Sequence, residues 1–382
     1  MTRKKITVSA SVLKWARVTR FGARKEEAAK RLKVTIQELD NWETINPTIS
    51  TAVLKKISIV YKRHISVLML KTPPVSQEPP KFRTLINFEG LSFDQKTFLA
   101  IRQAQEIQAT TSYLLDEKEN QSLKELTKSS STVETLVNKI SDLLKINDIS
   151  RFQTKNSKEQ LVFWKRAIES LGIIVLQQSF PVNDIRAFTI YDKSAPVIML
   201  NSRDTDNARI FSLFHELGHL ALRQTDSDSA FSLNIEPRKK DEFFCNNFAA
   251  SFLVPTGLLR KITSGINGYD DSSVKELADK FKVSKSVIWR KLRDSSIISQ
   301  SEFNAIKRQL DYFEAYSTNK KVPKKGGGKN TYLYTVMNTR GEFYLSEVFD
   351  AYSSRKISYF EVLDYIGIKA NNLPKLQKLM FT

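Results

Sequence analysis

The chain is poor in the residues that usually hold metals or form disulfides. Its 382 residues include three histidines and one cysteine. A single cysteine excludes an internal disulfide and fits a reducing compartment, so we expect a cytoplasmic protein. The sequence also lacks an apolar run long enough to span a bilayer and a secretory signal at its start. A membrane partner is therefore not expected.

Acidic residues are scarce relative to basic ones. The chain has 60 lysines and arginines against 41 aspartates and glutamates, which gives a formal net charge of +19. Such a balance predicts an anionic partner, most simply DNA. A lysine-rich surface that only keeps the protein soluble is the alternative.

Two of the three histidines stand four residues apart in an H-E-x-x-H motif, from His215 through Glu216 to His219. On a helix these positions lie on one face, so both imidazoles can reach one zinc ion. The surrounding run, residues 209–222, is apolar on nearly every side, and a divalent cation would compensate the buried polar groups. The motif therefore predicts a zinc site with Glu216 as the base for water. Two satisfied core histidines are the alternative.

A catalytic zinc needs a third protein ligand. Residues 241–255 have apolar positions at helical spacing and end at Pro255, where a helix would stop. Glu242 and Asn246 lie one turn apart on the same face, which makes Glu242 the expected third ligand and Asn246 a side chain that orients a ligand. A solvated glutamate in the first turn of the helix is the alternative for Glu242. Cys245 is expected to be a buried structural thiol.

The motif and the stretch 242–255 together resemble the ImmA/IrrE family of metallopeptidases. The resemblance implies that His215, His219 and Glu242 bind zinc, with manganese as the alternative ion, and that Glu216 is the catalytic base. It extends more loosely to most of the chain.

Three short apolar runs, residues 173–176, 187–191 and 197–200, are bounded by turn residues and predict strands. Together with the helices around them they predict an α+β fold. Residues 195–201 resemble the family's strand before the active-site helix. In similar folds such an edge strand holds an extended peptide by backbone hydrogen bonds, and simple sheet core is the alternative.

The N-terminal residues predict an all-helical domain. Residues 28–39 have the spacing of a helix-turn-helix, with Thr35 as an N-cap and Ile36, Leu39 and Trp42 facing inward. They resemble the XRE helix-turn-helix family, which usually has glycine where this chain has Lys33. The second helix carries acids and no arginine, which suits DNA poorly. A protein-binding or structural role is the alternative to DNA binding.

A second helix-turn-helix spacing occupies residues 274–292, after the predicted metal site. Ser284 is expected to cap its second helix. Phosphate contact is expected from four basic residues: Lys285, Arg290, Lys291 and Arg293. A scaffold that only packs on the peptidase is the alternative.

These segments predict seven parts along the chain. They are an XRE-like domain (1–72), a proline-rich linker (73–90), a helical segment (91–150), the metallopeptidase core (151–258), a helix-turn-helix-like segment (259–318), a basic glycine-rich linker (319–330) and a small α+β domain (331–382) with strands at 332–336 and 343–345.

The leading functional prediction is a zinc-dependent endopeptidase that cleaves a regulatory protein. The family resemblance implies a helix-turn-helix repressor as substrate, in a DNA-linked stress circuit. The alternative is a DNA- and protein-binding regulator, or the antitoxin of a toxin–antitoxin pair, with a structural or silent zinc site. A structural site is normally closed by a fourth protein ligand, so the number of ligands separates the two. The sequence predicts no oligomeric state.

Overall fold

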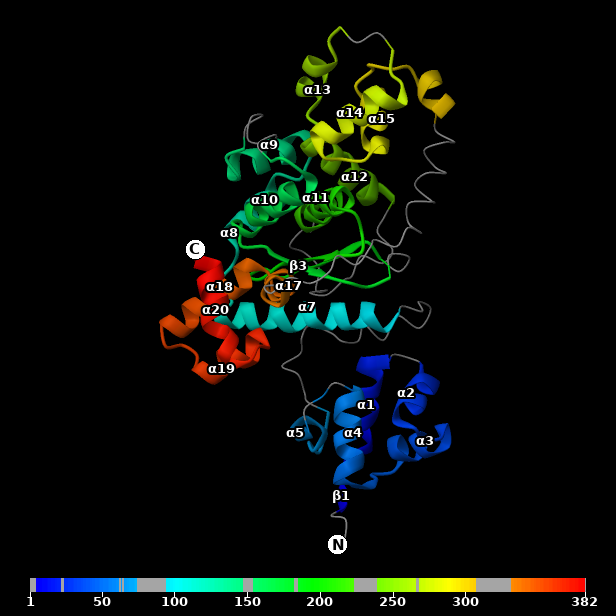
Figure 1. The fold of residues 1–382 in the computed structure, drawn as a ribbon, viewed down its shortest axis with the longest axis vertical. Helices are drawn as coiled ribbons and strands as arrows, with labels where there is room; N and C mark the ends of the chain where they lie inside the picture. Colours follow the sequence, from blue (N-terminus) through cyan, green and yellow to red (C-terminus); the bar gives the residue numbers. More distant parts are fainter. Residues whose placement is uncertain are drawn as a thin grey trace. The chain divides into compact units, whose positions relative to one another are not determined.

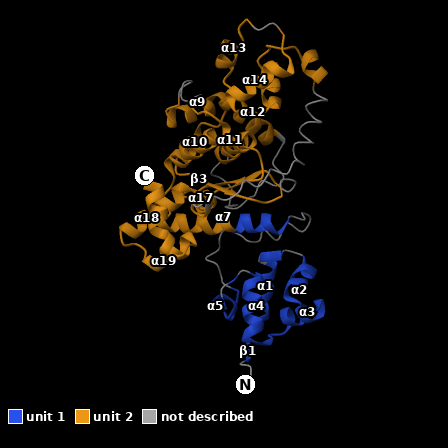
Figure 2. Ribbon diagram, in the orientation of Figure 1, with its two compact units in different colours: residues 1–102 blue, residues 103–382 orange. Residues whose placement is uncertain are grey.

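The computed structural model describes residues 5–21, 24–61, 63, 65–73, 94–146, 154–181, 185–222, 239–265, 268–306 and 331–381. The chain divides into two compact units, residues 1–102 and 103–382, and the division falls within helix α7 (Gln95–Leu114) (Figure 2). The described part is mixed α+β and mostly helical. Most of both predicted linkers lies outside the described residues, and the seven-part division stays a prediction.

The N-terminal unit contains short helices and one pair of strands. Its elements are β1 (Lys5–Thr7), α1 (Ala10–Phe21), α2 (Lys25–Leu32), α3 (Ile36–Thr44), β2 (Thr48–Ser50), α4 (Thr51–Tyr61) and α5 (Ile65–Leu68). The all-helical prediction is wrong here, because β1 and β2 pair antiparallel. Strands of three residues are too short to show a reliable alternation of apolar and polar positions.

Helices α2 and α3 are joined by the short turn that the sequence predicts. Lys33 has a φ of 51°, in the left-handed region. This explains why glycine suits that position. The Thr35 hydroxyl accepts a hydrogen bond from the backbone N–H of Glu38 at 3.1 Å, as a helix N-cap does. Leu39 is buried as predicted, but the prediction for Ile36 is wrong, since its side chain is 45% exposed.

The second unit is built on a three-stranded sheet at the three predicted positions: β3 (Ile174–Gln178), β4 (Ala187–Ile190) and β5 (Val197–Asn201). The strand order is β3-β5-β4, with β3 and β5 parallel and β4 antiparallel to β5. The expectation that residues 195–201 form an edge strand is therefore wrong. All five residues of β5 are buried, as a continuous apolar run in a central strand should be. The edge strand next to α11 (Asp206–Leu222), the helix of the H-E-x-x-H motif, is β4.

Helices α10 (Ser157–Glu169) and α11 (Asp206–Leu222) pack against this sheet, and α12 (Lys239–Leu253) packs on α11 (Figure 1). Trp164 of α10, Phe214 of α11 and Phe252 of α12 form an aromatic cluster, with ring centroids between 4.4 and 5.5 Å apart. This cluster fixes the two helices that carry the predicted ligands, because buried aromatic rings contribute large contact areas. Helices α8 (Gln121–Lys128) and α9 (Val133–Leu143) join the same core.

The segment after α12 is helical and continues the same hydrophobic core. It contains α13 (Thr256–Thr263), α14 (Asp271–Phe281) and α15 (Lys285–Asp294), and residues 300–306 are also helical. Lys282 adopts a left-handed φ of 55° in the turn between α14 and α15, and Ser284 caps α15 as predicted. The two helix pairs, α2–α3 and α14–α15, thus share one turn geometry.

The C-terminal segment is helical throughout its described length. It contains α17 (Thr331–Arg340), α18 (Glu342–Ser353), α19 (Tyr359–Ile366), the 3₁₀ turn η2 (Ala370–Asn372) and α20 (Leu373–Phe381). The prediction of a strand pair and a small α+β domain is therefore wrong. Leu333, Val336 and Met337 are buried at helical spacing because α17 packs along β3. Tertiary packing overrides the strand propensity of this tyrosine- and threonine-rich run.

Among the described residues, no helix has the length and apolar character that crossing a membrane requires.

Candidate metal centre

Three side chains from two neighbouring helices converge on one point. His215 and His219 lie one turn apart on α11, with their Nε2 atoms 3.1 Å apart. Glu242 comes from the first turns of α12, and its carboxylate oxygens lie 3.3 Å from Nε2 of His215 and 2.9 Å from Nε2 of His219. The ligand atoms of all three lie within 4.8 Å of one another. The structure thus brings together the three predicted zinc ligands.

The two imidazoles are in a state that suits metal binding. Burial is the main cause that lowers the pKa of His219 to about 4, with the neighbouring ring of His215 adding to the effect. Burial also lowers the pKa of His215, against the opposing influence of Glu242 and Asn246. Both rings are therefore neutral near pH 7, and a neutral imidazole offers the lone pair that a cation needs.

The pKa of Glu216 is shifted upward, whereas those of the two histidines are lowered. Its side chain is buried, and burial followed by the negative charge of Glu242 raises its pKa to about 8. A hydrogen bond from the hydroxyl of Thr189, on β4, acts in the other direction. Two carboxyl groups in one buried site repel each other unless a positive charge lies between them. A cation held by the His215–His219–Glu242 cluster would favour the ionised form of Glu216.

Asn246 lies one turn after Glu242 and forms a side-chain hydrogen bond with His215. This is the neighbour predicted from the spacing, and its orienting role stays a prediction. The Nδ1 atom of His215 is buried and has no hydrogen-bond partner among the described residues. Metal-ligating histidines usually donate from their second nitrogen, so this atom needs a water or a further group.

Gly218 sets the closeness of α11 and α12. A Cβ atom at this position would lie 3.0 Å from Sγ of Cys245, 3.2 Å from Cδ1 of Phe248 and 3.3 Å from Cα of Cys245. A larger residue would push α12, and Glu242 with it, away from the histidines. Gly218 was not among the predicted site residues, although a glycine inside an apolar helix signals close helix packing. Thr189 was not predicted either, because no local pattern marks it.

Cys245 is fully buried, as predicted for a structural thiol. Burial raises its pKa far above the usual range, and the charges of Glu216 and Glu242 add to this effect. A thiol that stays protonated is a poor zinc ligand. Within the described ranges the cluster comprises three ligand side chains. The donor set of two imidazoles and one carboxylate fits a zinc site with an open position.

The four basic residues predicted to contact DNA differ in their surroundings. Lys291 is buried, and its ammonium group donates to the hydroxyls of Ser251 and Thr256 at 3.3 and 3.2 Å. It therefore ties α15 to α12 and α13 and has little access to a phosphate, and DNA contact by this residue stays a prediction. Lys285 pairs with Asp271 at 2.6 Å.

The other two members of the set remain at the surface. Arg290 is exposed, and Arg293 pairs with Asp294 at 2.7 Å and stacks on Phe303. DNA contact by Lys285, Arg290 and Arg293 stays a prediction.

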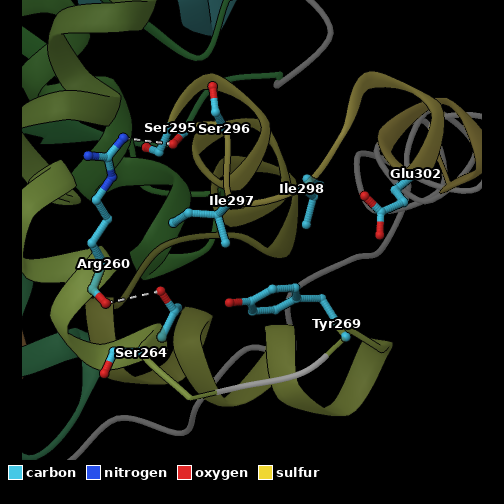
Figure 3. Close-up of a pocket in the computed structure, with 10 residues that line it drawn as sticks. Arg260, Ser264, Tyr269, Ser295, Ser296, Ile297, Ile298 and Glu302 are labelled. Atoms are coloured by element: carbon cyan, nitrogen blue, oxygen red, sulfur yellow. Dashed lines mark hydrogen bonds between the residues drawn. The ribbon is translucent and has the colours of Figure 1, made fainter.

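A separate cavity of about 520 Å³ lies beside α13 and the residues that follow α15 (Figure 3). Arg260 crosses one side of it and donates to the backbone carbonyl of Ser295 at 3.0 Å. Tyr269 and Glu302 line other parts. No residue of the His215–His219–Glu242 cluster lines this cavity, so it is distinct from the candidate metal centre.

Comparison with known proteins supports the family that the motif suggested. Residues 168–293 match the family model Peptidase_M78, described as the IrrE N-terminal-like domain. The match covers β3 to α15 and so includes the whole candidate metal centre. It supports the ImmA/IrrE family for this segment, and the N-terminal unit lies outside it. Searches of the curated proteins and of the solved structures return no significant match.

Proposed function

We propose that the chain is a zinc-dependent endopeptidase that acts on a protein partner. The observation that carries the proposal is the convergence of His215, His219 and Glu242 beside the buried carboxyl of Glu216. The match of residues 168–293 to a peptidase family supports the same activity. The metal would be held by the two imidazoles and the carboxylate, and manganese is the alternative ion.

A zinc ion in this site would supply Lewis-acid polarisation of a peptide carbonyl and would acidify a water molecule. The carboxylate of Glu216 would accept a proton from the attacking water and return it to the amine of the leaving peptide. Thr189 holds the carboxyl of Glu216 by a hydrogen bond. The three side chains found among the described residues are the number that catalytic zinc sites use.

The edge of β4 that faces away from β5 is the proposed place for an extended substrate, although all four residues of β4 are buried in this structure. The backbone N–H of Asn201 donates to the carbonyl of Arg186. By the alternation of an antiparallel ladder, the backbone groups of Ala187 and Thr189 then point away from β5. A peptide paired along this edge would run past Thr189 and therefore past Glu216.

The substrate class is proposed from the family resemblance. We infer a regulatory protein, with a helix-turn-helix repressor as the first candidate and a DNA-linked stress circuit as the setting. The alternative, a regulator or antitoxin with a silent metal site, predicts partner binding without cleavage.

The test is a digest of purified candidate repressors by the full chain with added zinc or manganese. Glu216→Gln should lower the cleavage rate by about a hundredfold to ten-thousandfold while leaving metal binding intact. Glu276→Gln, an exposed glutamate on α14, is the matched control and should cleave like the parent. If Glu216→Gln cleaves as fast as the parent, the proposed role of Glu216 is wrong.

A further inference from the structure

The N-terminal unit contains a cluster of three arginines around one carboxylate. Arg20 lies in the last turn of α1, Arg24 precedes α2, and Arg31 lies in the last turn of α2. Glu27 pairs with Nη1 of Arg24 at 3.7 Å and with Nη2 of Arg31 at 2.7 Å. Arg20 and Arg31 each place their guanidinium carbon within 6 Å of the ring centre of Phe21, at 5.9 and 5.7 Å. Three positive charges thus share one negative charge.

Arg20 is the unusual member of this cluster. Arg20 is only 5% exposed, and the Nε and Nη1 atoms of its side chain have no hydrogen-bond partner among the described residues. Nη2 of Arg24 is also buried without a hydrogen-bond partner among the described residues. Buried guanidinium donors without acceptors are costly, because burial removes the water that would otherwise bind them. The pKa of Arg20 is lowered to about 10, first by burial and then by the charges of Arg102 and Arg31. This shift reflects the same cost of burying the charge.

An anion with several acceptor oxygens would satisfy these donors and balance their charge. Glu27 is already engaged by Arg24 and Arg31. Asp40 pairs with Lys25 and Glu43 pairs with Arg17. Glu26, in the first turn of α2, is exposed, and among the described residues it forms no ion pair with the three arginines. The side chains of Arg24 and Arg31 are 32% and 46% exposed, so the cluster is open to solvent on their side. Guanidinium groups match phosphate oxygens in geometry and charge.

The charge of the whole segment favours a polymer as the source of that phosphate. Residues 1–72 contain 16 lysines and arginines against five acids, so they hold +11 of the net charge of +19 in less than a fifth of the chain. Such a density attracts a polyanion more strongly than a single small ion. The cluster lies on α1 and α2, and it includes no residue of the acidic α3 or of α15.

We propose that Arg20, Arg24 and Arg31 form a phosphate-binding site for the backbone of a nucleic acid. The proposed contacts go to the phosphate backbone, and such contacts position a protein on a nucleic acid without reading its sequence. It is independent of the proposed peptidase and would hold the N-terminal unit on DNA or RNA by charge and shape.

The experiment measures binding of the full chain to labelled random-sequence duplex DNA, single-stranded DNA and single-stranded RNA over a salt series. Arg20→Gln should weaken binding at low salt by about tenfold. It should also reduce the slope of log affinity against log salt by about 0.9 for each duplex phosphate that the site no longer neutralises. Arg20→Lys keeps the charge but not the planar fork, and should fall between the parent and Arg20→Gln.

Lys5→Gln is the matched control, since it removes one positive charge from the exposed strand β1 at the other end of α1. It should change the affinity by less than about threefold. Thermal unfolding distinguishes an effect of the substitution on folding from an effect on binding. Arg20→Gln should be at least as stable as the parent, because it removes an uncompensated buried charge. A variant that melts early would indicate a structural role for Arg20 and would contradict the proposal.

Inorganic phosphate serves as a second probe. It should raise the melting temperature of the parent and not that of Arg20→Gln, and it should compete with the nucleic acids. If inorganic phosphate binds but none of the nucleic acids does, a nucleic acid is not the source of the phosphate, and the proposal is wrong. Equal binding of nucleic acid by Arg20→Gln and the parent would overturn the site itself.

Discussion

Gly218 determines how closely α11 and α12, the helices that carry the predicted zinc ligands, can pack. Gly218→Ala would place a methyl group 3.0 Å from Sγ of Cys245 and 3.3 Å from its Cα, and the backbone atom cannot move without shifting α12. We expect a loss of about 1–3 kcal/mol in the free energy of unfolding from overpacking. Alanine gains about 1 kcal/mol over glycine in a helix interior, so the net loss should be up to about 2 kcal/mol. Chemical denaturation measures the difference.

The control for this variant is Gly257→Ala in α13, where a Cβ atom would meet nothing within 4 Å. That variant should keep or raise the stability of the protein, because alanine favours a helix over glycine. If Gly218→Ala proved as stable as Gly257→Ala, the close contact between α11 and α12 would not exist in solution.

Glu169, at the end of α10, gives the stability of the second unit a pH dependence. Burial is the main cause that raises its pKa to about 7, against the opposing charge of Lys165. Its Oε2 atom has no hydrogen-bond partner among the described residues. Because the folded pKa lies above the ordinary value of 4.5, the folded state binds the proton more tightly. Stability should therefore fall as the pH rises from about 5 to about 7.

Glu169→Gln cannot ionise and should remove up to about 2 kcal/mol of that fall. The measurement is urea denaturation of the parent and the variant at a series of pH values across this window. Parallel curves for the two proteins would show that Glu169 ionises normally in the folded state.

At the scale of elements, both short-turn helix pairs depend on a lysine in the left-handed conformation. Lys33 has a φ of 51° and Lys282 a φ of 55°. Lys33→Gly should stabilise the N-terminal unit by about 0.5–1 kcal/mol, because glycine adopts this conformation without steric cost. Thermal unfolding followed by circular dichroism measures the shift.

Lys30→Gly is the natural comparison, since it lies three residues earlier inside α2. There glycine should destabilise the unit by about 1 kcal/mol. Opposite signs for the two glycine variants are expected, and a loss of stability in both would mean that the turn after α2 differs from the one described.

The sequence predicted best those elements whose signals are local. The three strands of the sheet, α11, α12 and the Thr35 and Ser284 caps were predicted near their observed positions because each has an apolar run, a stop signal or a capping residue. The C-terminal strands were predicted wrongly because the burial of Leu333 and Met337 comes from packing on β3, about 160 residues away in the chain.

The metal cluster could be predicted for a different reason. His215 and His219 form a motif within one helix turn, and Glu242 follows from the family resemblance. The hydrogen bond from Thr189 to Glu216 could not be predicted, because it joins β4 to α11 through the fold. Which strand lies at the edge was also beyond the local pattern, since strand order depends on the connection between strands.

At the scale of the whole molecule, metal binding should couple to the stability of the unit formed by residues 103–382. A ligand that binds only the folded state stabilises it, by about 4 kcal/mol at a thousand times its dissociation constant. Removal of the metal with a chelator should therefore lower the melting temperature by several degrees, and added zinc should restore it. His219→Ala should be insensitive to the chelator. Calorimetry with and without chelator gives both values.

The most direct test of the account is the metal content of the purified full chain, measured by mass spectrometry after zinc loading and removal of loosely bound ions. The parent and Glu216→Gln should each retain about one zinc per chain, because Glu216 is not a ligand. His215→Ala, His219→Ala and Glu242→Gln should retain much less. A parent that holds no zinc, or a His219→Ala variant that holds as much as the parent, would contradict the proposed metal centre.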